Sequence, residues 1–137
     1  MNNPDNQNSL PAYIANAATN QATFYTSAAN IETTPYPFAE TVFEASPLNR
    51  VTAQGAAGAD WQIANGHTTK IEYGTNAYQE VRNYIMLNAN TFFFAANTLF
   101  KKITKDENWV AADLKNGTTE EFTNLEGRLI LKRTYTD

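Results

Sequence analysis

The sequence predicts a mainly β fold, an antiparallel sheet of short strands and hairpins preceded by a loosely ordered polar arm. From about Tyr36 onward, aromatic and β-branched residues become frequent, and turn residues recur about every 8 to 12 positions, which is typical of short antiparallel strands. Several of these segments also alternate apolar and polar residues with the period of two that gives a strand one core-facing side. We therefore divide the chain into an arm, residues 1–34, and a β domain, residues 35–137.

The N-terminal arm is rich in Asn, Ala, Thr and Gln and carries few large apolar side chains. Such a composition buries too little surface to offset the entropy lost on ordering, so we expect an arm that is partly disordered. One short strand is expected within it, near Thr23 to Thr26. The arm lacks the basic and apolar regions of a signal peptide, and no apolar run in the sequence has the length of a transmembrane helix.

Two segments in the middle of the β domain are predicted to be strands. The first runs from His67 to Tyr73 after an Asn65-Gly66 turn, and its even and odd positions differ in polarity. The second contains Val81, Ile85 and Leu87, which share one parity, with Arg82 on the other.

The most apolar window runs from Tyr84 to Phe94 and is interrupted by Asn88-Ala89-Asn90. A helix would gain nothing from these Asn residues, so the window predicts a hairpin with a short polar turn. Phe92, Phe93 and Phe94 follow one another, so their rings point to both faces of a strand. Because a buried Phe side chain contributes roughly 1.5 to 3 kcal/mol, an uncovered ring would favour association. These three residues are therefore a candidate interface as well as candidate core.

Asn116-Gly117 is the strongest hairpin signal in the chain. It lies between Ala111 to Leu114 and Thr118 to Phe122, and both turn residues tolerate the positive φ of a two-residue type I′ turn. We expect these flanking segments to pair as strands.

A related turn is expected at Asn124 to Gly127. Asn124 can accept a hydrogen bond from the backbone two residues on, and Gly127 can adopt the left-handed conformation, after which Arg128 to Tyr135 reads as a strand. A similar order of residues occurs from Phe43 to Val51, where Asn49 takes the place of the glycine. The sequence therefore predicts two turns of one kind, with Asn49 and Gly127 as their structural residues.

The order aromatic residue, polar turn, Gly or Asn, Arg, aliphatic residue resembles the repeat of bacterial Rhs (YD-repeat) proteins. Read from about Phe24 to Tyr135, the chain is similar to the domain of unknown function that precedes these repeats in long Rhs-core proteins. The segments that carry this resemblance are Pro37 to Val51, Gly55 to Gly58, Trp61-Gln62, Gly66-His67-Thr68, Glu72 to Asn76, Thr98-Leu99-Phe100, Lys105 to Asn108 and Glu126-Gly127-Arg128.

The resemblance implies an Rhs-shell-like or sandwich β domain in a secreted or surface protein, where it would help to assemble or close a β-shell that can enclose a toxin. Relatives continue into further strands, whereas this sequence stops at Asp137. If Arg128 to Tyr135 is a strand, its outer edge is then open, and we expect dimers or larger species through edge pairing or strand exchange. Arg128, Lys132 and Arg133 would partly protect that edge. The expected partner is the rest of an Rhs shell or a second copy.

The composition limits the kinds of catalytic and binding sites that the chain can form. The chain has no Cys and one His, His67, and its formal charge is −4. These counts exclude thiolate nucleophiles, cysteine-zinc centres and multi-His metal sites, and they disfavour nucleic acid as a partner. The carboxylate pairs Asp106-Glu107 and Glu120-Glu121 are adjacent in extended chain, where neighbours point to opposite faces, so we expect no catalytic residue, metal or cofactor.

Two rival functions remain open. The first is a carbohydrate- or peptide-binding β module that uses Trp61, Trp109 or the Phe92 to Phe94 cluster as a stacking platform. The second is a small hydrolase built on His67 with Ser9, Ser27 or Ser46. The sequence favours a non-enzymatic structural module over both.

Overall fold

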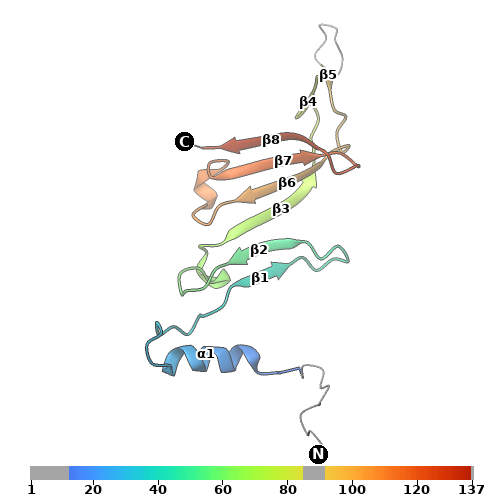
Figure 1. Cartoon of the computed structure of the whole chain (residues 1–137). Helices are drawn as coiled ribbons and strands as arrows, with labels where there is room; N and C mark the ends of the chain where they lie inside the picture. The colour runs from blue at the N-terminus through green and yellow to red at the C-terminus, as the bar shows by residue number, and fades with distance from the viewer. Residues whose placement is uncertain (1–12, 85–91, 137) are drawn as a thin grey trace, which may run out of the picture. The chain divides into compact units, whose positions relative to one another are not determined.

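The computed structural model describes residues 13–84 and 92–136. The chain divides into two compact units, one up to Pro37 and one from Phe38 onward. The predicted mainly β class is confirmed, because the described residues contain eight strands and one α-helix (Figure 1).

The first unit contains the helix α1, Ala17–Ser27, so the strand expected near Thr23 to Thr26 is wrong. Alanine favours a helix here, and the hydroxyl groups bond the preceding helical turn instead of a neighbouring strand. Thr23 Oγ1 donates to the carbonyl of Thr19 at 2.9 Å, and Ser27 Oγ donates to the carbonyl of Thr23 at 2.9 Å. No residue of α1 is buried, so the sequence offered no apolar stripe by which to recognise it.

The second unit is built on a six-stranded sheet in the order β1-β2-β3-β6-β7-β8, with every neighbouring pair antiparallel (Figure 1). The segment expected as a strand from His67 to Tyr73 is largely β3. The strands of this sheet are β1 Glu40–Phe43, β2 Val51–Gly55, β3 Thr69–Thr75, β6 Phe100–Lys105, β7 Thr118–Thr123 and β8 Leu129–Tyr135. Two short 3₁₀ helices, η1 Ile63–Asn65 and η2 Ala111–Asp113, lie in its connections.

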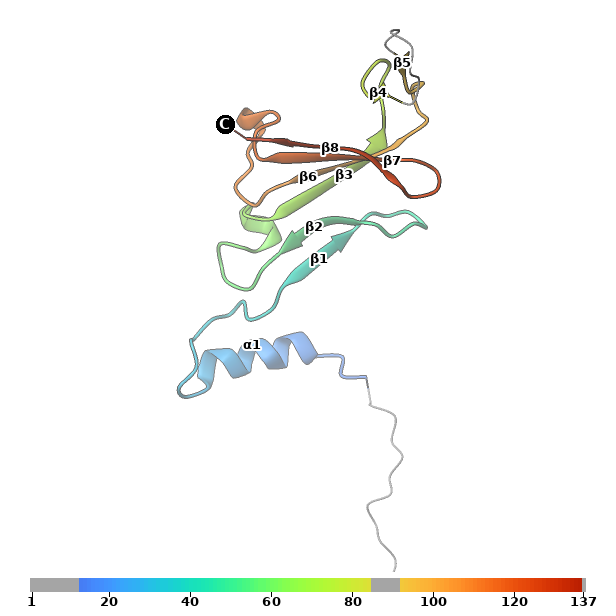
Figure 2. The same cartoon turned by 45° about the horizontal axis from the view of Figure 1, so that its top comes forward.

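A small two-stranded ribbon is inserted between β3 and β6. It consists of β4, Arg82–Asn83, and β5, Phe92–Phe93, which pair antiparallel with Arg82 opposite Phe93. Figures 1 and 2 show the ribbon projecting from the end of the sheet at which β3 finishes and β6 begins. The ribbon is antiparallel, as the predicted hairpin requires, but its first strand precedes the predicted Tyr84 to Phe94 window. The predicted Asn88 to Asn90 turn, Ile85 and Leu87 lie outside the described residues.

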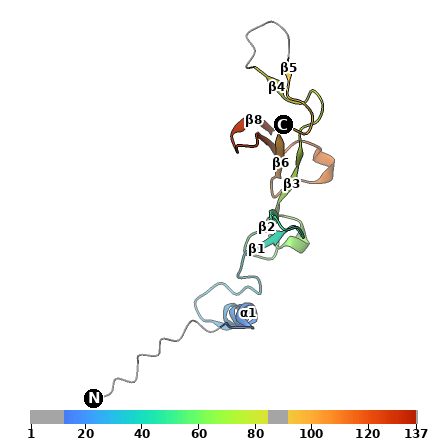
Figure 3. The same ribbon diagram turned by 90° about the vertical axis from the view of Figure 1, so that its right-hand side faces the viewer.

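The hydrophobic core is small. Among the described residues its fully buried members are Val81, Leu99 and Phe122, with Phe94 and Leu131 packed against them. It therefore lies where the segment after β3 folds over the face of β6, β7 and β8. In Figure 3 the main sheet is seen nearly edge-on, as one layer.

The β6–β7 connection contradicts the hairpin predicted at Asn116-Gly117. The chain instead runs from Asp106 through η2 to Gly117, and only Gly117 of the two expected turn residues has a positive φ, 70°. Asp106 explains the difference, since its backbone N–H donates to the carbonyl of Gly117 at 3.0 Å and its Oδ1 accepts from Asn108 N–H at 3.0 Å. A Cβ on Gly117 would lie 2.7 Å from Asp106 Oδ2, so a side chain here would have to displace the Asp106 carboxylate, and the positive φ also favours glycine.

The β1–β2 and β7–β8 turns share one design. Asn49 has a φ of 48° and Gly127 a φ of 77°, and each is followed by Arg. A β-bulge adjoins each turn, and the turns close through hydrogen bonds from Glu44 N–H to Arg50 O at 2.9 Å and from Asn124 N–H to Arg128 O at 3.0 Å. The expected bond to Asn124 Oδ1 from the backbone two residues on, at Glu126, is present at 3.0 Å.

Candidate interaction site at the β8 edge

Strand β8 is one edge of the main sheet, and among the described residues it pairs with β7 alone. Its sequence, LILKRTY, contains two cations and no acid. Leu129 and Ile130 are 55% and 37% exposed. An edge of this kind offers unpaired N–H and C=O groups to another strand, together with apolar side chains that the strand would cover.

On one face of the sheet, side chains of alternating charge form a row across the strands that ends at β8. Lys102, Glu121 and Lys132 lie directly opposite one another on β6, β7 and β8. Glu121 is 3.4 Å from Lys102 Nζ and 3.3 Å from Lys132 Nζ, and the hydrogen bond from Lys132 is the main cause of its lowered pKa. The cation of Lys132 is therefore the outermost charge of this row.

The other face carries a buried charge cluster around Glu120, which is 2% exposed. Its carboxylate lies 3.2 Å from Lys101 Nζ, 3.1 Å from Lys115 Nζ and 3.6 Å from an Arg133 nitrogen, and it accepts a hydrogen bond from the Tyr135 hydroxyl at 3.0 Å. Burial alone would raise the pKa of Glu120, but the hydrogen bonds from Lys115, Lys101 and Tyr135 outweigh it and hold the pKa below the ordinary value.

Glu80 connects the segment after β3 to this cluster. Lys101 Nζ lies 2.6 Å from the Glu80 carboxylate, and Arg133 donates a hydrogen bond to the Glu80 backbone carbonyl. Burial would raise the pKa of Glu80, and the hydrogen bonds from Lys101 and the Ala77 N–H more than offset it. The Phe122 ring lies beneath, 5.2 Å from Lys101 Nζ and 5.4 Å from Arg133 Cζ. These contacts hold the segment against β6 and β8.

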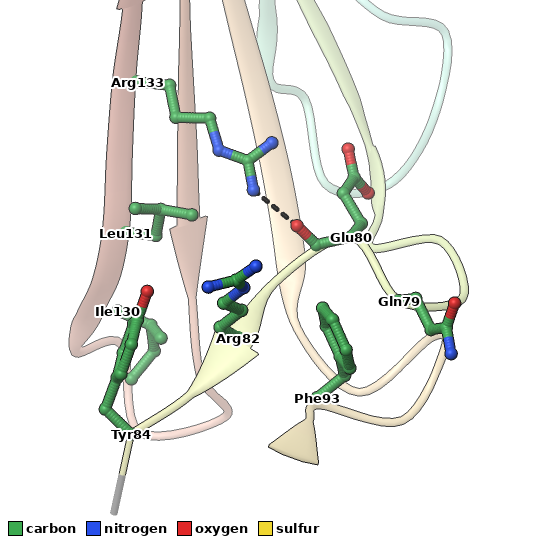
Figure 4. Close-up of a pocket in the computed structure, with 8 residues that line it drawn as sticks. All are labelled: Gln79, Glu80, Arg82, Tyr84, Phe93, Ile130, Leu131 and Arg133. Atoms are coloured by element: carbon green, nitrogen blue, oxygen red, sulfur yellow. Dashed lines mark hydrogen bonds between the residues drawn. The ribbon is translucent and has the colours of Figure 1, made fainter. Parts of the chain in front are cut away.

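A pocket of about 420 Å³ opens beside β8, between that strand and the β4–β5 ribbon (Figure 4). Its walls combine two arginines, one acid and several apolar side chains. The lining residues are Gln79, Glu80, Arg82, Tyr84, Phe93, Ile130, Leu131 and Arg133. The ion pairs found among residues 13–84 and 92–136 use the other three arginines, Arg50, Arg128 and Arg133, but not Arg82.

The structure brings together only some of the residues singled out in the sequence. Phe93 lines the pocket, Phe94 packs on the core, and Phe92 is 42% exposed, so the three rings do not form one patch. Lys132 lies on β8, and Arg128 stands just before it with its side chain 77% exposed. Arg82, Glu80 and Tyr84 were not identified in advance as site residues. In the sequence, Arg82 was noted only for its parity opposite to Val81, and Tyr84 only as the start of the apolar window.

Trp109 and Trp61, the rival aromatic platforms, lie outside the pocket beside β8, and each contacts another side chain. Lys105 Nζ lies 3.8 Å from the Trp109 ring centroid, and Lys70 Nζ lies 5.8 Å from it. Trp61, 40% exposed, makes an edge contact with His67 at 6.0 Å between ring centroids. These contacts place amines, which a sugar would have to displace, on the Trp109 ring.

The hydrolase alternative gains no support from the described residues, and Ser9, one of its three candidate nucleophiles, lies outside them. Ser46 donates its hydroxyl hydrogen to Glu44 at 2.6 Å rather than to an imidazole, and Ser27 bonds the α1 backbone.

Across residues 13–84 and 92–136, no cluster of His, Asp and Glu has the form of a metal site. The helices in this part of the chain are also too short or too polar to cross a bilayer.

Comparison with known proteins finds a family. A family model described as a domain of unknown function, DUF6443, matches residues 3–75, more than half of the chain and the part that contains α1 and β1 to β3. Neither the curated proteins nor the solved structures contain a match. The pocket and β8 lie beyond the matched residues. The chain belongs to the DUF6443 family, whose function is not characterised.

Proposed function

We propose that this domain is a non-enzymatic structural module of an Rhs-type secreted or surface protein, in which it contributes to the assembly or closure of a β-shell. The observation that carries the proposal is the open edge of β8 on a regular six-stranded antiparallel sheet. Through this edge the sheet can continue into further strands without any change in its hydrogen-bonding pattern.

The thin core supports the same role. Only three hydrophobic side chains are fully buried in the described part of the chain, whereas Phe43, Phe100 and Leu129 are each about half exposed. A one-layer sheet gains much of its stability from what covers its faces and edges. We infer that this module gains additional apolar burial within a larger β structure.

The paired turns give a second line of support. The unit at Asn49 and the unit at Gly127 each combine a positive φ, a following Arg and an adjacent bulge. A bulge increases the local twist of a strand pair, so repeated units of this kind bend a sheet progressively. A curved sheet is what a shell requires, and the order of residues in these turns is the feature that resembles the Rhs repeats.

The electrostatics of Glu80, Glu120 and Glu121 fit a structural role and are unfavourable for general-acid catalysis. A general acid at neutral pH needs a carboxyl group with a raised pKa, whereas the cations beside Glu80, Glu120 and Glu121 lower theirs. These carboxylates are fixed anions that bind β6, β7 and β8 together.

The proposal is tested by the structure of the complete product of the gene that encodes this sequence, determined by electron cryomicroscopy. We expect β8 to be hydrogen-bonded on both sides, to β7 and to a strand from outside the 137 residues. A complete product in which the outer edge of β8 faces solvent, or in which the surrounding fold is not a β-shell, would contradict the proposal.

A further inference from the structure

We infer that the pocket beside β8 is a specificity pocket for a carboxylate side chain on the strand that pairs with this edge, so the partner is an extended acidic strand. The inference rests on the proposed function, because it requires that β8 accepts another strand. It adds the chemistry by which the right strand is selected.

The geometry places an incoming side chain at the pocket. A strand paired with β8 lies about 4.8 Å away and points alternate side chains to each face of the sheet. Leu131 and Arg133 mark the face on which the pocket lies, since Leu131 packs on the core and Arg133 donates to the Glu80 carbonyl. Residues of the ribbon, among them Arg82 and Phe93, line the same pocket from the other side (Figure 4).

The lining chemistry selects an anion. Glu80 is the one acid of the lining, and Lys101 and the Ala77 N–H already bond its carboxylate. The Arg82 guanidinium, in contrast, forms no ion pair with any residue that the structure describes. Its planar array of donors matches a carboxylate in a two-point hydrogen bond. The apolar atoms of Phe93 and Leu131 can contact the methylene groups of an Asp or Glu side chain.

The charge on β8 indicates the same partner. On one face Lys132 ends the row that begins with Lys102 and Glu121, so an acid on the next strand would continue the alternation. Opposite charges placed across neighbouring strands stabilise a sheet, and like charges destabilise it. A second copy of β8 would bring Lys132 and Arg133 and no carboxylate, whatever the register. An acidic strand of another segment therefore fits this edge better than a second β8.

The test uses three synthetic peptides with blocked ends, Thr-Val-X-Val-Thr-Val, in which X is Glu, Gln or Lys. Each is titrated into the ¹⁵N-labelled chain, and binding is followed by the shifts of the β8 amide signals and of the Arg82 side-chain Nε signal. We expect the Glu peptide to bind about tenfold more tightly than the Gln peptide, the size of one charge-assisted hydrogen bond, and the Lys peptide to bind most weakly.

Two variants of equal charge locate the effect. Arg82→Gln should abolish most of the preference for the Glu peptide, whereas Arg128→Gln, which removes a highly exposed guanidinium outside the pocket, should retain it. Arg82→Lys keeps the charge without the planar fork, and we expect an intermediate preference. The dispersion of each variant's amide spectrum reports whether it remains folded.

The outcomes separate this inference from the proposed function. Equal binding of the Glu and Gln peptides at β8 would overturn the pocket and leave edge pairing intact. A preference that survives Arg82→Gln would also overturn it. Failure of all three peptides to shift the β8 amide signals would count against edge pairing itself, and so against both. An edge already occupied by a second copy at low salt, seen by sedimentation, would replace the acidic strand as the occupant.

Discussion

Glu120 shows how single residues hold this thin sheet together. Its carboxylate is almost completely buried, yet it contacts Lys101 on β6, Lys115 in the β6–β7 loop and Arg133 on β8. Burying one charge is costly, and the cost is offset only where partners and hydrogen bonds surround it. Removing the carboxylate would therefore leave several cations at the cluster without their shared anion.

Glu120→Gln is expected to lower the free energy of unfolding by about 3 kcal/mol, because removing one partner of a buried ion pair leaves the charge of the other partner uncompensated. Glu126→Gln is the matched control, because Glu126 pairs with Arg128 at 3.2 Å but is 67% exposed. Its effect should be smaller than about 1 kcal/mol. Urea denaturation of the two variants measures the difference, and equal losses would contradict the assigned role of Glu120.

The same residue predicts how stability depends on pH. The folded-state pKa of Glu120 lies below the ordinary 4.5, so its carboxylate stabilises the fold above that value. This contribution is lost as the pH falls through the lowered folded-state pKa. Urea denaturation from about pH 7 to about pH 3 should show stability falling at the acid end, and falling less in Glu120→Gln. Identical pH profiles for the two proteins would contradict this expectation.

At the scale of elements, the sequence predicted turns well where one residue's backbone preference decides the outcome. Asn49 and Gly127 both have the left-handed conformation expected of them. The predictions from sequence were wrong where a hydrogen bond to a distant residue, or an alternative local hydrogen bond, determines the structure. Asp106 bonds Gly117 and replaces the expected Asn116-Gly117 hairpin with a longer loop, and Thr23 bonds within a helix instead of a sheet.

Gly127→Ala tests the turn. A Cβ at this position would meet nothing within 4 Å, so the cost arises from the positive φ alone and is expected to be about 1 to 2 kcal/mol. Gly127→Asn should cost less, since Asn occupies the equivalent position at residue 49.

Gly74→Ala is the control for this turn. It too has open space for a Cβ, but its φ is not in the left-handed region, and the substitution should be neutral or stabilising by roughly 0.5 kcal/mol. Thermal unfolding compares the three variants. Equal losses for Gly127→Ala and Gly74→Ala would contradict the importance of the turn conformation.

At the scale of the whole molecule, the sequence predicted the fold class and an open last strand, but not the pocket. Arg82 and Arg133 are about fifty positions apart in the sequence, and their shared pocket depends on how the segment after β3 folds back over β8. The alternation of polar and apolar residues within one segment does not show which distant segments come together. The buried cluster at Glu120 could not be predicted for the same reason, because parity places Glu120 and Glu121 on opposite faces of the strand but does not show which face is buried.

The charges on β8 also modify the expectation of self-association. A second β8 would bring Lys132 and Arg133 close to the same cations, so we expect the 137-residue chain to be mainly monomeric at low salt. Salt near 1 M shortens the screening length to about 3 Å and should allow dimers or larger species to form through the edge. Sedimentation velocity measures this shift. A strict monomer at high salt and high protein concentration would indicate an edge that does not pair with itself.

We propose that β8 is an inner strand of a larger sheet. Backbone amide hydrogen exchange, compared between this chain alone and the complete gene product, distinguishes an inner strand from an edge strand. We expect amides of Leu129–Tyr135 that exchange rapidly in the isolated chain to become strongly protected in the complete product, while those of β7 are protected in both. Rapid exchange along β8 in both proteins would show that β8 stays an edge strand.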